Sequence, residues 1–144
     1  MTVKQISVFL ENKPGQLREF AMLLDHHQID MRALSVAEAE DFGILRLIVD
    51  DTYKTACVLK EAGYVFSITP VLALEIPDHP GSLVDVLRLL EENGINLEYT
   101  YAFITRKAGS AYMIFRVEEP DRAAQLLCAG GYKTICQSDM ADLF

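Results

Sequence analysis

The sequence contains one internal duplication, and this feature constrains the fold more than any other. Pro14-Gly15 and Pro80-Gly81 lie 66 positions apart. The same offset relates the apolar residues that follow each pair: Leu17, Phe20, Ala21 and Leu24 match Leu83, Val86, Leu87 and Leu90. Agreement of turn residues and apolar phase indicates that one structural unit is present twice.

The apolar spacing predicts an amphipathic helix after each Pro-Gly pair, because positions i, i+3, i+4 and i+7 share one helical face. Before each helix, alternating apolar residues predict a strand with one buried face, near Val3–Leu10 and around Leu72–Ile76. The match continues to Ile29-Asp30-Met31 and Ile95-Asn96-Leu97. After a gain of two residues, Gly63-Tyr64 then matches Gly131-Tyr132 at an offset of 68.

Each unit therefore reads as strand, helix, strand, strand, helix, strand. The remaining strands are expected near Met31–Ala37, Leu45–Val49, Val65–Ile68, Leu97–Ile104, Ala111–Phe115 and Lys133–Cys136, and the second helices near Tyr53–Ala62 and Asp121–Ala129. This order predicts an α+β fold of two tandem ferredoxin-like βαββαβ units, residues 1–68 and 69–144, each an antiparallel sheet with its helices on one face. Units of about 70 residues have marginal cores, so we expect the halves to pack on each other or on a second chain.

Charge and cysteine content exclude several classes of function. The net charge of −8 disfavours nucleic acids and anionic membranes as partners. No apolar run is long enough to span a bilayer, and the first residues lack a secretory signal. The three cysteines, Cys57, Cys128 and Cys136, form no close pair, which predicts reduced thiols in a cytoplasmic protein. Neither they nor the three histidines have metal-site spacing, so we expect no metal and no cofactor.

The two Pro-Gly segments carry a resemblance to a known family. Asn12-Lys13-Pro14-Gly15-Gln16-Leu17 and Asp78-His79-Pro80-Gly81-Ser82-Leu83 each precede a helix, and Ile-Asp/Asn-Met/Leu opens the strand that follows it. This arrangement resembles the ACT domain, and the resemblance covers almost the whole chain, twice. It implies a non-catalytic regulatory protein that binds an amino acid or a similar small metabolite where two domains meet. It also implies a homodimer and a metabolic enzyme as regulated partner, although no catalytic domain is attached to this chain.

The resemblance further implies which residues bind the ligand. They lie in the loop before the first helix of each unit and at the start of its second strand: Asn12, Lys13, Pro14, Gly15, Gln16, Leu17, Asp30 and Met31 in the first unit, and Asp78, His79, Pro80, Gly81, Ser82, Leu83, Asn96 and Leu97 in the second. The chemistry is reasonable, since amides at a helix N-terminus suit a carboxylate and side-chain oxygens accept from an ammonium. Because the two sets of residues differ, the two sites are not expected to be equivalent.

Simpler interpretations exist for several of these residues. Asn12 and Asp78 are also typical helix caps, Asp30 and Asn96 are typical turn residues, and His79 is typical of an exposed loop. Tyr99, Tyr101 and Phe103 alternate along one strand, as in a base-stacking platform, but packing explains them more simply. A structural pairing module with a degenerate ligand site remains the alternative function. An enzyme is disfavoured, because no Cys–His, Ser–His or phosphate-loop arrangement recurs at matching positions.

Overall fold

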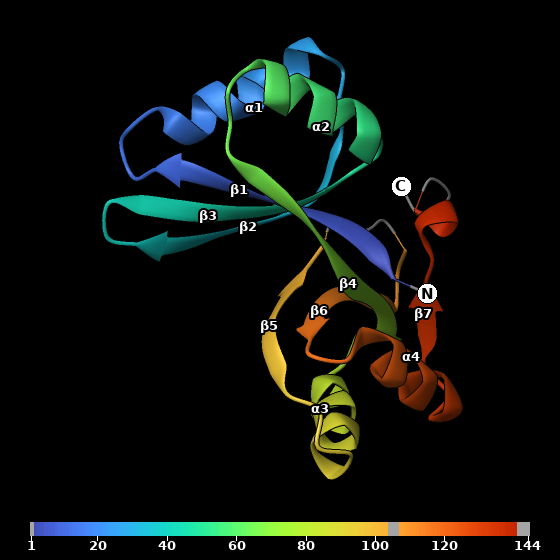
Figure 1. Cartoon of the computed structure of the whole chain (residues 1–144). Coiled ribbons are helices and arrows are strands. Elements are labelled where there is room, and N and C mark those ends of the chain that lie inside the picture. The colour runs from blue at the N-terminus through green and yellow to red at the C-terminus, as the bar shows by residue number, and fades with distance from the viewer. Residues whose placement is uncertain (1, 104–106, 141–144) are drawn as a thin grey trace. The chain divides into compact units, whose positions relative to one another are not determined.

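The computed structural model describes residues 2–103 and 107–140, which form seven strands and four α-helices in the predicted order (Figure 1). Their bounds are β1 Val3–Glu11, α1 Gln16–His26, β2 Met31–Ala39, β3 Phe42–Val49, α2 Thr52–Glu61, β4 Phe66–Pro77, α3 Ser82–Glu92, β5 Leu97–Ala102, β6 Ser110–Val117, α4 Pro120–Ala129 and β7 Lys133–Ile135, followed by a 3₁₀ turn at Gln137–Asp139. Ile104, expected at the end of β5, lies outside the described residues.

The first compact unit spans Lys4–Thr69. Its strands lie in the order β2-β3-β1-β4. Strand β3 pairs with β1 on one side and with β2 on the other, both antiparallel. The helices α1 and α2 cover one face of this sheet (Figure 1). Central strand β1 places alternate residues on the helix side, opposite Leu45 and Leu47 of β3. This is the ferredoxin-like arrangement that the residue pattern predicts.

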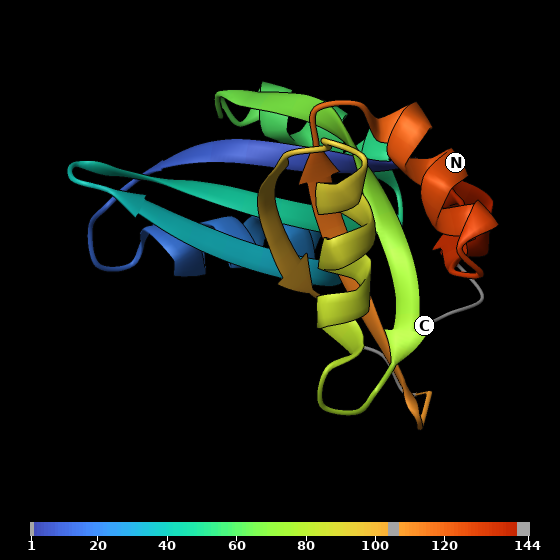
Figure 2. The ribbon, with the colours of Figure 1, turned by 90° about the horizontal axis from the view of Figure 1, so that it is seen from below.

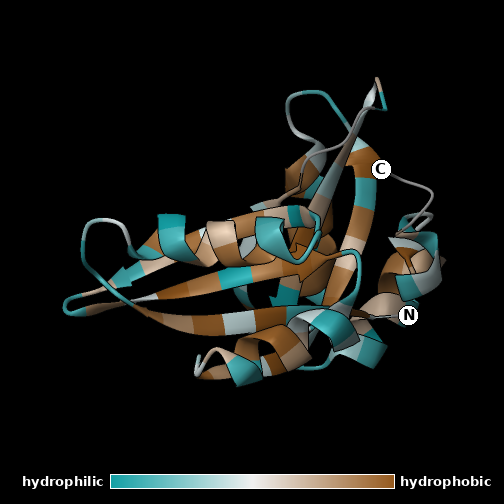
Figure 3. Cartoon of the chain, turned by 90° about the horizontal axis from the view of Figure 1, so that it is seen from above, coloured by the Kyte–Doolittle hydropathy of each residue, from teal (hydrophilic) through white to brown (hydrophobic). Residues whose placement is uncertain are grey.

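The core of the first unit lies between the sheet and its two helices. Phe20 and Leu24 of α1 are buried, as the i, i+4 spacing of the sequence requires. The buried residues packed together here are Ile6, Val8, Leu10, Phe20, Leu24, Ile29, Leu45, Leu47, Val49, Val58 and Leu59. Figure 3 shows the consequence: strands are hydrophobic for most of their length, whereas helices alternate between hydrophobic and hydrophilic residues.

The second compact unit consists of Pro70–Phe144 together with Met1–Val3, and from Pro70 onward it repeats the same plan. Its strand order is β7-β4-β6-β5, again antiparallel, and α3 runs beside the start of β5 (Figure 2). Val86 and Leu90 are the counterparts of Phe20 and Leu24 and are equally buried. The cluster comprises Leu72, Leu74, Ile76, Val86, Leu90, Ile95, Phe115, Val117, Ala123, Ala124 and Leu127.

Strand β4 is longer than the sequence predicts. We expected one strand to end at Ile68 and another to begin near Leu72, but a single strand runs from Phe66 to Pro77. Its first residues belong to the first unit and its remainder to the second. Pro70 does not interrupt this strand. A proline lacks only its own backbone N–H, so a strand tolerates it where that N–H would not bond to a neighbouring strand.

Both units contain a β-bulge at the same place. The register shifts between Met31 and Ala33 in β2 and between Leu97 and Tyr99 in β5, immediately after the Ile-Asp/Asn-Met/Leu motif. A bulge inserts one extra residue and turns the strand locally. The extra residue is Arg32 in one unit and Glu98 in the other, so the duplicated fold presents opposite charges at one position.

Candidate functional site

The Pro-Gly loops join β1 to α1 and β4 to α3 through a left-handed glycine. Gly15 and Gly81 are the N-cap residues of α1 and α3, with φ of 87° and 91°. Other residue types seldom adopt this conformation because their Cβ approaches the following carbonyl. No side chain caps the first turn of either helix, although the Gln16 and Ser82 N–H groups donate to the carbonyls of Lys13 and His79, each at 3.3 Å. Helix-start amides without a side-chain acceptor suit an anionic group.

The interpretation of Asn12 as a helix cap is wrong, because its side chain makes no capping hydrogen bond to α1. Its side-chain amide donates to the Glu40 carbonyl at 3.0 Å, and its backbone N–H donates to the Asp41 carbonyl at 3.0 Å. Asn12 thereby fastens the loop to the β2–β3 turn. In the second unit the backbone N–H of Asp78 makes the equivalent bond to the Gly109 carbonyl, 3.1 Å away, and the helix again begins at a glycine.

The second position of each loop differs between the units. The Lys13 ammonium pairs with the Glu11 carboxylate at 2.8 Å, and this contact lowers the pKa of Glu11. His79 instead lies against the hydroxyl of Ser82, whose Oγ is 3.0 Å from Nδ1. The Pro80 carbonyl is 3.1 Å from the same nitrogen.

The contact between Ser82 and His79 was not anticipated, because the first unit has Gln16 and Lys13 at these positions. Ser82 is 5% exposed and His79 is exposed. In the described part of the chain no carboxylate hydrogen-bonds the His79 ring, so the third group of a nucleophilic triad is missing. The pair rigidifies the loop and offers polar atoms beside the open helix end.

At the start of β2, Asp30 is already engaged. Its carboxylate pairs with the Arg32 guanidinium at 3.1 Å. Its backbone N–H donates to the Asp50 carboxylate at 3.1 Å, and its carbonyl accepts from the Asp50 N–H at 3.1 Å. A turn role for Asp30 is therefore sufficient to explain the residue in this structure.

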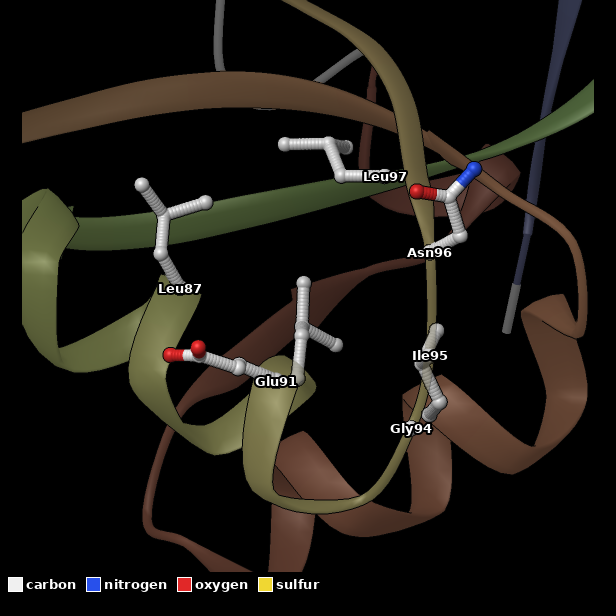
Figure 4. Close-up of a pocket in the computed structure, with 7 residues that line it drawn as sticks. Leu87, Glu91, Gly94, Ile95, Asn96 and Leu97 are labelled. Atoms are coloured by element: carbon white, nitrogen blue, oxygen red, sulfur yellow. The ribbon is translucent and has the colours of Figure 1, made fainter.

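The start of β5 lines a pocket of about 460 Å³. Two predicted residues contribute to it, Asn96 just before β5 and Leu97 at the start of β5, and Leu87 and Glu91 contribute from α3 (Figure 4). Leu90, Gly94 and Ile95 complete the lining. The pocket thus combines aliphatic side chains with one carboxylate and one carboxamide, the composition expected for a small polar ligand.

Leu87 and Glu91 were missed as site residues. They are one helical turn apart on α3 and both line the pocket, and in the view of Figure 4 the Glu91 side chain points away from Asn96 and β5. The sequence contained a signal for them: Leu87 and Glu91 are four positions apart and therefore share one face of the helix that precedes β5. The first-unit counterparts are Ala21 and Asp25, so only the second unit has a large aliphatic side chain here.

The predicted site residues fall into two half-sites. One is the Pro-Gly loop at the N-terminal end of the first helix, and the other is the strand start beyond its C-terminal end. Both helices, α1 and α3, have 11 residues, which corresponds to a length of about 16 Å. The structure therefore does not bring the two halves together within either unit.

The three aromatic residues considered as a base-stacking platform do not form one exposed surface, because one of them is buried. Phe103 is 6% exposed and its ring packs against Tyr112 at 5.4 Å. Tyr99 and Tyr101 stack on each other, with ring centroids 6.5 Å apart. Burial accounts for Phe103, whereas Tyr99 and Tyr101 remain partly exposed.

Two negative findings concern only the part of the chain that the structure describes. Residues 2–103 and 107–140 contain no group of three His, Cys, Asp or Glu side chains able to hold a metal ion. Within the same residues, no helix has the length and apolar character needed to cross a membrane.

Solved structures give a consistent set of similarities. A structure of protein BT0572 from Bacteroides thetaiotaomicron is 37% identical, with a TM-score of 0.90, over 96% of this chain and 95% of that one. The ligand-free regulatory subunit of aspartate kinase from Thermus thermophilus is 14% identical, with a TM-score of 0.64, over 88% and 90%. The corresponding subunit from Thermus flavus is 14% identical, with a TM-score of 0.59, over 85% and 86%. The last two similarities establish the fold alone.

Sequence comparison gives the family directly. A search of curated protein sequences returned no match. The family described as "ACT domain pair" matches residues 1–144, which is the entire duplicated region. Its two domains correspond to the two copies of the repeat, and each copy has the ferredoxin-like order of strands and helices found in the structure. The chain therefore belongs to the ACT domain pair family.

Proposed function

We propose that this protein is a non-catalytic regulator that binds an amino acid or a similar small metabolite at a composite site. One half of the site is the Pro-Gly loop of one domain, and the other is the strand start of a different domain. The observation that carries the proposal is the separation of the half-sites by the whole length of the first helix. A ligand that contacts both halves must therefore sit between two domains.

The chemistry of the halves suits a zwitterion. The uncapped first turns of α1 and α3 offer backbone N–H groups to a carboxylate. Oxygen atoms of Glu91 and Asn96 in the β5 pocket can accept from an ammonium. Leu87 and Leu97 in the same pocket provide contact surface for an aliphatic side chain.

Self-association through sheet edges would bring half-sites of different domains together. Strand β2 is an edge strand of the first unit. On the helix side of this strand, Leu34 is 42% exposed and Val36 is 54% exposed. An unpaired edge with apolar side chains favours pairing with another strand. We infer a homodimer, with a metabolic enzyme as the further partner that it regulates.

The proposal also includes a cytoplasmic location. Cys57, Cys128 and Cys136 are free in the structure. Unpaired thiols are typical of reducing compartments.

A structural pairing module with a degenerate ligand site is the second candidate. The observation in its favour is the ion pair between Asp30 and Arg32, because it occupies the carboxylate that a ligand ammonium would need in the first unit. The second unit has Asn96 in place of Asp30 and Glu98 in place of Arg32. Glu98 pairs with Arg116 at 3.2 Å and so does not engage Asn96. We therefore assign ligand binding to the half-site at β5.

A thermal-shift screen against the common amino acids tests the proposal. A ligand at 100 times its Kd adds about 2.7 kcal/mol to the free energy of unfolding, which raises the melting temperature by several degrees. Asn96→Ala and Glu91→Gln should abolish the shift produced by the active amino acid. Their first-unit counterparts Asp30→Ala and Asp25→Asn serve as matched controls and should retain it. If no amino acid shifts the melting temperature at millimolar concentration, the structural pairing module is the better account.

A further inference from the structure

The second domain has another groove, which shares no lining residue with the β5 pocket. It has a volume of about 500 Å³ and lies where β4 ends, β6 begins and β7 pairs with β4. Its polar lining consists of Glu75, Lys107, Ser110, Tyr132 and Lys133. We call it the lysine groove, after Lys107 and Lys133.

The charges in the lysine groove are arranged around Glu75. The Glu75 carboxylate accepts from the Lys107 ammonium at 2.5 Å and from the Ser110 hydroxyl at 2.8 Å, through the same oxygen. The Glu75 side chain is only 15% exposed, whereas that of Lys107 is 54% exposed. Lys107 therefore neutralises Glu75 while part of its ammonium still faces solvent.

Lys133 supplies an additional positive charge. It lies directly across the β4–β7 pair from Glu75 and is exposed. Lys133 makes no ion pair with another described residue. The groove thus carries an excess positive charge, although the chain as a whole carries −8.

The fold itself does not require this polar cluster. At the equivalent positions of the first domain, Phe9 replaces Glu75, Phe42 replaces Ser110 and Val65 replaces Lys133. There the rings of Phe9 and Phe42 pack against each other, with centroids 5.9 Å apart. The first domain folds with apolar residues at these positions. The charged residues of the lysine groove are therefore a specialisation of the second domain.

A buried phenol adjoins the cluster. Tyr112 lies across the β4–β6 pair from Glu75 and is 1% exposed. Burial raises the pKa of Tyr112, and the Glu75 carboxylate and the Lys107 ammonium lie close enough to its hydroxyl for both to affect this pKa, although no bond of good geometry joins them. The phenol is therefore part of the polar cluster around Glu75.

We propose that the lysine groove binds a small molecule that carries an oxyanion, either a carboxylate or a phosphate. Lys133 contacts the oxyanion directly, and Lys107 contributes a second N–H donor in a position fixed by Glu75. A charge-assisted hydrogen bond of this kind is stronger than a neutral one. The proposal does not depend on amino-acid binding at the β5 half-site, because the two sites use different residues.

Amide NMR titrations test the proposal, with inorganic phosphate in one arm and succinate in the other. Both ions are added at constant ionic strength. We expect saturable shifts of the Gly109, Ser110, Gly131 and Lys133 amides in at least one arm. Saturation in the phosphate arm alone identifies a phosphate site, saturation in the succinate arm alone identifies a carboxylate site, and saturation in both identifies a general oxyanion site.

Three variants locate the binding. Lys133→Ala should weaken the affinity for the oxyanion by about tenfold, the loss expected for one charge-assisted contact. Lys133→Arg should retain it, since the charge and the donors remain. Lys60→Ala removes an exposed lysine of α2 and should leave it unchanged. Absence of saturation in both arms, or equal affinity of the Lys133→Ala variant and the unmodified protein, would overturn the proposal.

Discussion

At the residue scale, the shape of each Pro-Gly loop depends on one glycine. A Cβ at Gly81 would meet no heavy atom within 4 Å, so the cost of a side chain there comes from the backbone alone. We expect Gly81→Ala to lower the free energy of unfolding by about 1 kcal/mol, because φ is in the left-handed region. Gly81→Asn should lower it less, since Asn tolerates this conformation. Urea denaturation measures both changes, and an unchanged stability of the Ala variant would contradict the loop conformation.

A second prediction at this scale concerns Glu75. The hydrogen bond from Lys107 is the main cause that lowers the pKa of Glu75 below its ordinary value of 4.5. A carboxyl whose pKa is lower in the folded state stabilises the protein above the unfolded-state pKa, and this contribution is lost as the pH falls through the folded-state pKa.

Lys107→Met should therefore raise the pKa of Glu75 and lower the free energy of unfolding at neutral pH. It should also make the decline of stability toward acid pH shallower. Carbon-detected NMR titration of Glu75 and urea denaturation at several pH values check these effects, with Lys60→Met as the control for loss of a lysine. An unchanged Glu75 pKa in the Lys107→Met variant would show that the ion pair is absent in solution.

At the element scale, the second helices of the two units begin differently. The Asp51 side chain caps α2 by accepting from the Lys54 N–H at 2.9 Å, whereas Glu119 makes no such bond to α4. Asp51→Ala should lower the free energy of unfolding by about 1 kcal/mol. Glu119→Ala should lower the free energy of unfolding by less, because it removes only an exposed ion pair with Arg122. Equal losses in urea denaturation would refute this assignment of the caps.

The edge strand β2 gives a prediction about association. Val36 is 54% exposed on an unpaired edge. Val36→Lys should weaken self-association and leave the free energy of unfolding of the monomer nearly unchanged, since a lysine on an edge opposes strand addition. Tyr53→Lys on α2 is the control, because Tyr53 is 82% exposed and lies on a helix and not on a strand edge. Sedimentation equilibrium measures the masses, and an unaltered mass of the Val36→Lys variant would exclude the β2 edge as the interface.

At the scale of the whole molecule, most of the fold could be predicted from the repeat. Apolar periodicity locates the strands and helices, and the strand–helix order selects one sheet topology, because each signal is local in sequence. The continuity of β4 could not be predicted. Pro70 reads as a break in sequence, and only the strand pairings show that the backbone remains extended there.

The candidate site was less predictable, because its geometry depends on distances between elements. Leu87 and Glu91 join Asn96 in a pocket only after α3 folds back over β5. The hydrogen bond between Asn12 and Glu40 links residues 28 positions apart, so a local capping role seemed sufficient from sequence. The separation of the two half-sites follows from the length of an 11-residue helix, which residue types alone do not convey.

The central claim is that the ligand site is shared between domains of two copies of the chain in the proposed homodimer. Ligand that binds across such an interface must strengthen the association, because linkage is reciprocal. The most direct measurement is the dimer dissociation constant by sedimentation velocity, with and without the amino acid that stabilises the protein. The account predicts a lower dissociation constant with ligand, and no such decrease for the Asn96→Ala variant. A ligand that binds with an unchanged dissociation constant would place the site within a single copy of the chain and contradict the account.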